Sequence, residues 1–253
     1  MRRAGAAIQA ERLLERFGID APEHIKLEAL AHLLGVEVVD GPTHGCAAQL
    51  TPLGERARIR VRPNTHPGRR RFSIAHELGH FVLRHRTRTC TEKDLRDWGD
   101  DAGAERDANV FAAALLMPES MIQAHVDTDE AKLDHVVALA KRFDVSLTAA
   151  AIRFVETTAL ACALVNVEGG AIRWAVRNDD FWPYLLPRGS RIDAASFASK
   201  VRPTDASDVR PVAAACWIED DRVHPRRTLL EDARASADGS VLALLSLDWD
   251  EDE

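Results

Sequence analysis

Residues 76 to 80 read His-Glu-Leu-Gly-His, a pattern whose residue types and spacing suit a metal ion. At about 100° of rotation per helical residue, His76 and His80 fall within roughly 40° of one another on one helix face, so both imidazoles can bind one ion. Glu77 lies about a quarter-turn from His76, within reach of a metal-bound water without binding the metal itself. The pattern therefore predicts a zinc site in which Glu77 acts as general base on that water.

Two histidines do not complete such a site, because a catalytic zinc ion takes a third protein ligand and keeps a position for water. His85 is about 140° round from His80, so it cannot share the metal face while the helix stays regular. A second expected helix, from about 102 to 117, supplies Glu105 and Asp107. Apolar residues follow both acids at helical spacing, so periodicity leaves this choice open. One turn after Glu105, Asn109 is placed to hydrogen-bond a metal ligand and orient it.

The elements that must hold these residues can be placed from hydrophobic periodicity. Helical spacing predicts helices at 6–17, 27–34, 70–86, 102–117, 133–143 and 147–155. Alternating or short apolar runs predict strands at 36–39, 45–51, 58–62, 160–167, 171–176, 211–218 and 240–247. In the strand at 58–62 arginines alternate with apolar residues, so we expect a half-buried strand near a sheet edge.

The order of these elements predicts an α+β fold in three parts. A mostly helical metallopeptidase domain with a small sheet is expected over residues 1–125, and a helix-turn-helix-like helical unit over 126–158. The change from helical to strand periodicity near residue 158 then marks a separate β-rich C-terminal domain, residues 159–253. No motif assigns this last domain a role, and regulation or substrate recognition is our hypothesis for it.

The composition of the 253-residue chain is 46% hydrophobic and 29% charged with a net charge of −7, which excludes disorder throughout. Its longest apolar run is far shorter than the roughly 20 residues that a membrane helix needs, and its N-terminus lacks a secretory signal. The four cysteines are widely spaced, so neither a disulfide scaffold nor a zinc ribbon is indicated. We expect a cytoplasmic protein without membrane contact.

Two blocks of the chain together resemble the ImmA/IrrE family of bacterial zinc metallopeptidases. The first runs from Arg71 to Leu83 around the His-Glu-Leu-Gly-His pattern, and the second from Glu105 to Pro118. The opening helices and the stretch 139–146 are also similar to the family, so the resemblance covers roughly residues 5–157. It implies that Glu105 is the third zinc ligand, which makes the site gluzincin-like, with one zinc ion per chain.

The resemblance also implies a function. Family members cleave, or promote cleavage of, Xre-type helix-turn-helix repressors, which relieves repression of stress-response, mobile-element or toxin loci. We therefore expect a metalloendopeptidase whose partner is such a repressor. Because two imidazoles and a carboxylate discriminate poorly between metals, Mn²⁺ or another divalent ion can replace zinc in the cell.

Two rival functions keep the same fold. The chain can be a non-catalytic antirepressor that binds its repressor without cutting it, or a direct DNA-binding regulator that uses the helix pair at 133–155. The second helix of that pair offers only Arg153 as a basic side chain, which is poor for phosphate and base contacts. We therefore expect no direct binding of nucleic acid.

Other residues are weaker candidates for a part in the chemistry. Tyr184, His44, His66 and His85 are candidate donors to the oxyanion of the reaction, and Cys46 is a candidate thiolate ligand of zinc. Either the segment 45–51 or the strand at 58–62 could pair with an extended substrate by β-augmentation. Surface histidines, a buried neutral cysteine and ordinary sheet strands are the competing interpretations.

Overall fold

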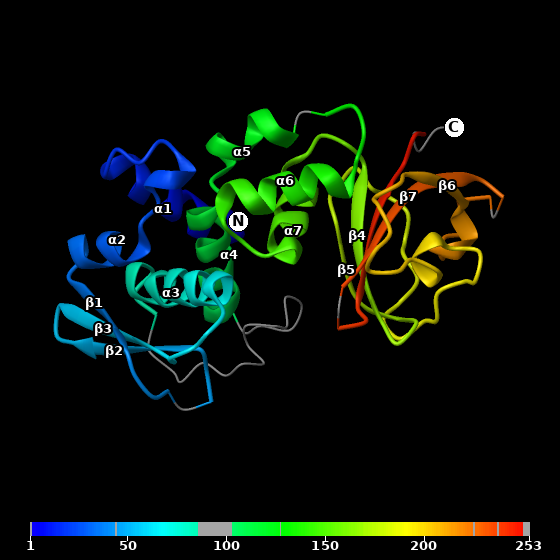
Figure 1. The fold of residues 1–253 in the computed structure, drawn as a ribbon. Coiled ribbons are helices and arrows are strands. Elements are labelled where there is room, and N and C mark those ends of the chain that lie inside the picture. The colour runs from blue at the N-terminus through cyan, green and yellow to red at the C-terminus, as the bar shows by residue number, and fades with distance from the viewer. Residues whose placement is uncertain are drawn as a thin grey trace. The chain divides into compact units, whose positions relative to one another are not determined.

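The computed structural model describes residues 2–43, 45–85, 103–126, 128–224, 226–236 and 238–249. Over these ranges the fold is α+β, with seven α-helices and two β-sheets (Figure 1). The chain divides into two compact units, one formed by residues 1–122 and 140–146 and the other by 123–139 and 147–253. The three-part division at 125 and 158 stays a prediction. His44, the connection at 87–101 and the last acidic residues lie outside the described ranges.

The first unit opens with helices α1, Arg2–Arg16, and α2, Leu27–Leu33, close to their predicted positions. The chain leaves them at Gly18 and Gly35, whose φ angles of 64° and 80° are the left-handed conformation that glycine adopts without strain. Leucines and alanines of both helices belong to the buried core of this unit. These helices therefore pack by the amphipathic faces that the periodicity predicts.

The small sheet of this unit has the strand order β1-β3-β2, with bounds Val36–Asp40, Arg56–Val61 and Ala48–Leu53 for β1, β3 and β2. β1 is parallel to β3 and β2 is antiparallel to it. The arginine-rich strand is half-buried as predicted, but its expected place near an edge is wrong, because β3 has a partner on both sides. β2 lies at the end of this strand order, and an edge strand tolerates a proline such as Pro52.

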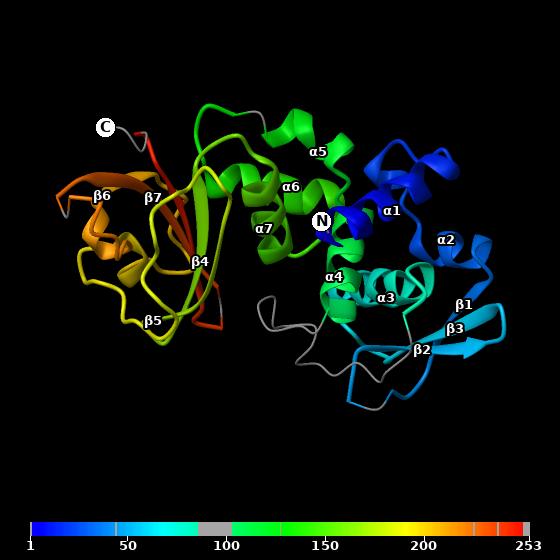
Figure 2. The same cartoon turned by 180° about the vertical axis from the view of Figure 1, so that it is seen from behind.

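Two helices cross beside this sheet. Helix α3, Pro67–Val82, packs on β2 and β3, and helix α4, Gly103–Leu116, packs on α3 (Figures 1 and 2). A Cβ added at Gly79 would lie 3.2 Å from both the Cα and the carbonyl oxygen of Ala108. Because this separation is tighter than most Cβ contacts in proteins, a side chain here would push the backbone of α4 away, and the glycine permits α4 to approach α3 this closely.

Three more helices follow: α5, Glu119–Val126, α6, Leu133–Phe143, and α7, Leu147–Thr157. The last two form the predicted helical pair, joined by a turn in which Asp144 has a left-handed φ of 52°. Five residues of α7 are buried, and the helix packs against β4, Cys162–Glu168. Arg153 forms an ion pair with Glu156 at 3.0 Å. This helix is therefore a packing element of the second unit.

The second sheet is fully antiparallel, with the strand order β5-β4-β8-β7-β6. The other four strands of this sheet are β5, Ala171–Arg177, β6, Arg210–Ala213, β7, Thr228–Ala235, and β8, Val241–Ser246. The strand predicted at 211–218 is shorter than expected, because it turns into a 3₁₀ helix, Ala214–Cys216. β7 was not predicted at all.

β7 escapes hydrophobic periodicity because two adjacent acids, Glu231 and Asp232, are buried in its middle. Hydrogen bonds compensate for this burial, as they must for charged groups in a core. Glu231 accepts from four donors at 2.7–3.2 Å, which are the Ser196 hydroxyl, the Phe197 and Ala198 amides and the Trp217 indole. Asp232 accepts from the Leu133 amide at 2.7 Å.

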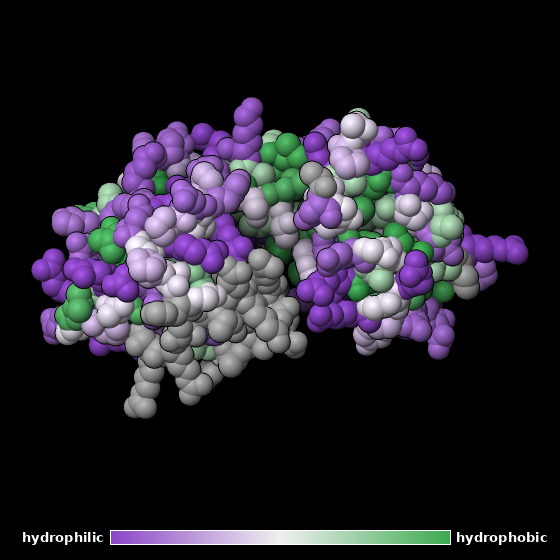
Figure 3. Space-filling model, turned by 60° about the horizontal axis from the view of Figure 1, so that its bottom comes forward, coloured by the Kyte–Doolittle hydropathy of each residue, from purple (hydrophilic) through white to green (hydrophobic). Residues whose placement is uncertain are grey.

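On the face drawn in Figure 3, hydrophilic residues are spread widely over the described surface. Large hydrophobic side chains that are exposed among the described residues are scattered, at Ile8, Leu33, Leu53 and Tyr184. None of the helices in the described ranges is long and apolar enough to cross a membrane.

Candidate metal centre

The two histidines of α3 face a carboxylate of α4. The Nε2 atoms of His76 and His80 are 3.0 Å apart, and the Glu105 Oε2 atom lies 3.3 Å and 3.4 Å from them. His76 is fully buried and His80 nearly so, while the Glu105 side chain is 18% exposed. The site therefore has two imidazoles on a buried helix and a carboxylate that keeps some contact with solvent.

These three atoms fit a tetrahedral metal ion. Ligand bonds of about 2.0–2.1 Å at tetrahedral angles place the ligand atoms about 3.3 Å apart, which matches the separations of 3.0–3.4 Å. Among the described residues, the potential metal ligands that cluster in this way are His76, His80 and Glu105. Asp107 is not one of them. Helical spacing leaves the third ligand open between Asp107 and Glu105, and the geometry favours Glu105.

The charges of the site favour an ionised Glu105. Burial by itself would raise its pKa, but hydrogen bonds from His76 and His80 outweigh burial and hold the pKa well below its ordinary value. A carboxylate that stays ionised is a good ligand for a divalent cation. This donor set of imidazole and carboxylate suits zinc and other divalent transition metals.

Glu77 is next to the metal-ligand cluster but points to a different partner. Its Oε2 accepts a hydrogen bond from the Leu50 amide of β2 at 3.1 Å, and only 4% of the residue is exposed. Burial is the main cause that raises its pKa to about 7, against the lowering effects of His80 and of the Leu50 hydrogen bond. A carboxyl group poised near neutral pH can both take and return a proton.

Asn109 lies where its predicted role needs it. Its Oδ1 is 2.8 Å from the Nδ1 of His76, and the residue is only 4% exposed. An amide oxygen can only accept, so the Nδ1 of His76 carries the proton of this hydrogen bond. With a metal ion bound, this tautomer would direct the Nε2 lone pair of His76 at the ion, in place of the hydrogen bond to Glu105.

His85 also contacts a histidine of the cluster, which spacing on a regular helix did not predict. Its Nδ1 lies 3.1 Å from the Nδ1 of His80. Burial, and next the charge of His80, lower the pKa of His85, so its neutral form is favoured. No sequence signal predicts this contact, because it depends on the backbone of Arg84, which takes a left-handed φ of 54° just after the helix.

The remaining candidates of the sequence are not brought into the cluster. His66 is exposed and precedes α3, ten residues or about 15 Å of helix before His76. Cys46 is buried but does not belong to the group of potential metal ligands. Tyr184 is 62% exposed and belongs to the other compact unit.

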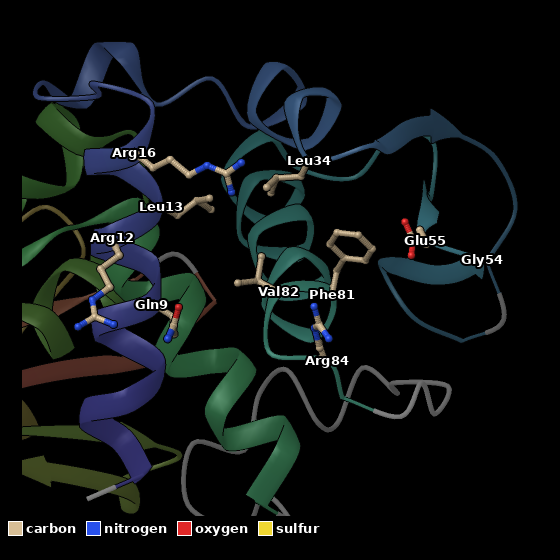
Figure 4. Close-up of a pocket in the computed structure, with 10 residues that line it drawn as sticks. All are labelled: Gln9, Arg12, Leu13, Arg16, Leu34, Gly54, Glu55, Phe81, Val82 and Arg84. Atoms are coloured by element: carbon tan, nitrogen blue, oxygen red, sulfur yellow. The ribbon is translucent and has the colours of Figure 1, made fainter.

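A cavity of about 660 Å³ lies elsewhere in the first unit, beside the C-terminal end of α3 (Figure 4). Three arginines and four apolar side chains contribute to its wall. The lining residues are Gln9, Arg12, Leu13, Arg16, Leu34, Gly54, Glu55, Phe81, Val82 and Arg84. None of them belongs to the metal-ligand cluster, so this cavity is distinct from the candidate metal centre.

Comparison with known proteins agrees with this geometry. Residues 31–155 match the family model of the M78 peptidases described as the IrrE N-terminal-like domain, and this range holds every residue of the cluster. Through residues 31–155, the chain belongs to the ImmA/IrrE family. A similar curated protein is the radiation response metalloprotease IrrE of Deinococcus deserti, which is 33% identical over 131 residues. That alignment covers 47% of this chain and 47% of IrrE, so the chain matches about half the length of this relative.

The fold extends beyond the ImmA/IrrE domain. A solved structure of a Mycobacterium tuberculosis transcriptional regulator is similar over 96% of this chain and 76% of its own, with a TM-score of 0.61 and 17% identity. At this identity the similarity concerns the fold alone. It includes most of the second unit, which lies beyond the range of the ImmA/IrrE match.

Proposed function

We propose that the chain is a zinc-dependent metalloendopeptidase that cuts a specific protein. The observation that carries this proposal is the set of three ligand atoms 3.0–3.4 Å apart with a buried Glu77 on the same helix. A divalent ion held by His76, His80 and Glu105 would polarise the scissile carbonyl and activate a water molecule. Membership of the ImmA/IrrE metallopeptidase family supports this chemistry.

Glu77 is the proposed general base. Its raised pKa lets it take a proton from the attacking water and pass it to the leaving amine within one turnover. The hydrogen bond from the Leu50 amide orients the Glu77 carboxyl group toward β2, which fixes the position of the group that takes and returns the proton. Asn109 fixes the orientation of His76 but takes no part in the proton transfer.

The outer edge of β2, which pairs with no other strand among the described residues, is the proposed place for the substrate backbone. β3 is paired on both sides, which removes it from the two strands that the sequence offered for β-augmentation. The Leu50 amide donates from this outer edge of β2 to Glu77, so an extended peptide that pairs along the same edge would pass beside the general base. This arrangement suits cleavage in an extended loop of a folded protein.

We propose an Xre-type helix-turn-helix repressor in the cytoplasm as the substrate, cut to relieve repression of a stress-response, mobile-element or toxin locus. The support is the family membership and the similarity to a radiation response metalloprotease. We propose zinc as the metal, and Mn²⁺ or another divalent ion can replace it where it is more available. The proposed role of the β-rich C-terminal part, residues 159–253, is then regulation or substrate recognition.

The test compares the zinc-loaded chain with its Glu77→Gln variant in a lysate of the organism that encodes it, followed by mass spectrometry of newly formed N-termini. We expect new N-termini in a helix-turn-helix repressor with the wild type and none above background with the variant. Equal sets of N-termini from both proteins would contradict the proposed mechanism. Loss of DNA binding by an intact repressor, with both proteins, would instead identify a non-catalytic antirepressor.

A further inference from the structure

The backbone after α3 folds back on itself. The helix ends at Val82, Arg84 takes a left-handed φ of 54°, and the His85 amide donates a hydrogen bond to the carbonyl oxygen of His80 at 3.0 Å. Such a closure is a common way to end a helix and satisfy its last carbonyl groups. Its consequence here is that His85 returns to the side of His80 instead of continuing round the helix.

The side chains meet at the nitrogen of His80 that faces away from the metal-ligand cluster. The Nδ1 of His80 is 3.1 Å from the Nδ1 of His85, and the two rings are edge to face with their centroids 5.1 Å apart. The opposite nitrogen of His80, Nε2, is 3.4 Å from Glu105. His80 is therefore held at both of its ring nitrogens.

The chemistry of imidazole assigns the proton between the two rings. A neutral histidine that offers its Nε2 lone pair to a metal carries its proton on Nδ1, and this N–H needs an acceptor. The Nδ1 of His85 lies at the right distance, so it accepts this hydrogen bond and carries its own proton on Nε2. Asn109 accepts the equivalent hydrogen bond from His76.

We propose that His85 is a positioning residue that fixes the tautomer and ring orientation of His80, so that each histidine of the site has its own hydrogen-bond acceptor. This inference rests on the proposed metal centre. Partners of this kind typically change metal affinity by about 10–100-fold. His85 acts through His80 and touches neither the metal nor the substrate.

The experiment measures the zinc affinity of purified variants by competition with a chromophoric chelator, and the visible absorption of the cobalt-loaded proteins. His85→Ala removes the acceptor, and His85→Asn restores one at about the position of Nδ1. His32→Ala is the matched control, because His32 is an exposed histidine of α2. Circular dichroism of the metal-free proteins checks that every variant folds.

We expect zinc binding to be about 10–100-fold weaker for His85→Ala, close to wild type for His85→Asn, and unchanged for His32→Ala. The cobalt spectrum should change for His85→Ala only. Wild-type affinity in His85→Ala would overturn the proposal, and so would equal losses in the alanine and asparagine variants, because packing alone would then explain them. A wild type that binds neither metal would refute the metal centre itself, which is a distinct result.

Discussion

Glu77 links the site to the stability of the metal-free protein. Because burial raises its pKa from 4.5 to about 7, the fold favours its neutral form. This contribution to stability is complete below pH 4.5 and is lost as the pH rises through about 7, by about 3 kcal/mol in total. We therefore expect the free energy of unfolding, measured with urea in the presence of a chelator, to fall more steeply over this range in the wild type than in Glu77→Gln.

The comparison of the two proteins isolates this one group, because the other titrating residues are common to both. Parallel stability profiles between pH 4.5 and 7 would show that the Glu77 carboxyl group is solvated and not buried as described. A wild-type profile that rises more steeply than that of the variant would give the opposite sign and would mean that Glu77 is held as a carboxylate.

Asn109 provides a second prediction at the scale of residues. Asn109→Ala removes the acceptor at the Nδ1 of His76, which leaves a buried N–H without it. We expect zinc affinity to fall by about 10–100-fold, and stability by about 1–3 kcal/mol. Asp107→Ala on the same helix is the control, and it should keep wild-type affinity in a chelator competition. Equal affinities for wild type and Asn109→Ala would remove this residue from the site.

At the scale of elements, the α3–α4 contact determines where Glu105 and Asn109 lie. Gly79→Ala places a methyl group 3.2 Å from the backbone of Ala108, which cannot rotate away. We expect a loss of about 1–3 kcal/mol in urea unfolding, together with weaker zinc binding, because α4 must shift. Gly68→Ala in the same helix meets nothing closer than 3.8 Å and should instead stabilise by up to about 1 kcal/mol. Similar stabilities for the two variants would contradict the close packing.

β7 carries a separate prediction about the second sheet. Glu231→Ala removes the shared acceptor of four donors, three of which are buried, so we expect a loss of at least about 3 kcal/mol in the free energy of unfolding. Glu219→Ala, at an exposed position, should change stability by less than about 0.5 kcal/mol. A Glu231 variant as stable as this control would show that the carboxylate does not organise the loop and strand around it.

These elements also show where sequence reasoning stops. Periodicity predicts the amphipathic helices and the apolar strands well, because it reads single faces of regular elements. It misses β7, whose buried acids are stabilised by donors from distant segments, and it places β3 wrongly, because strand order is set by tertiary pairing. It does not predict the contact of His85 with His80, because a regular helix was assumed to continue past the left-handed Arg84.

For the whole molecule, the resemblance to the ImmA/IrrE family added what spacing left open. The choice of Glu105 over Asp107 came from that resemblance, and the geometry favours the same residue. The match to the family model ends at residue 155, whereas the similarity in fold to a solved transcriptional regulator covers 96% of the chain. The sequence of the second unit carries no motif from which a role could be deduced, because its buried residues serve packing and hydrogen bonding within its own sheet.

His76, His80 and Glu105 together are expected to bind one metal ion, and the metal content of the purified protein tests this. We would purify wild type, Glu105→Ala and Asp107→Ala, load them with zinc, remove excess metal and measure zinc per chain by mass spectrometry. We expect one zinc ion per chain in wild type and Asp107→Ala, and far less than one in Glu105→Ala. No stoichiometric metal in the wild type, or equal loss in both variants, would contradict it.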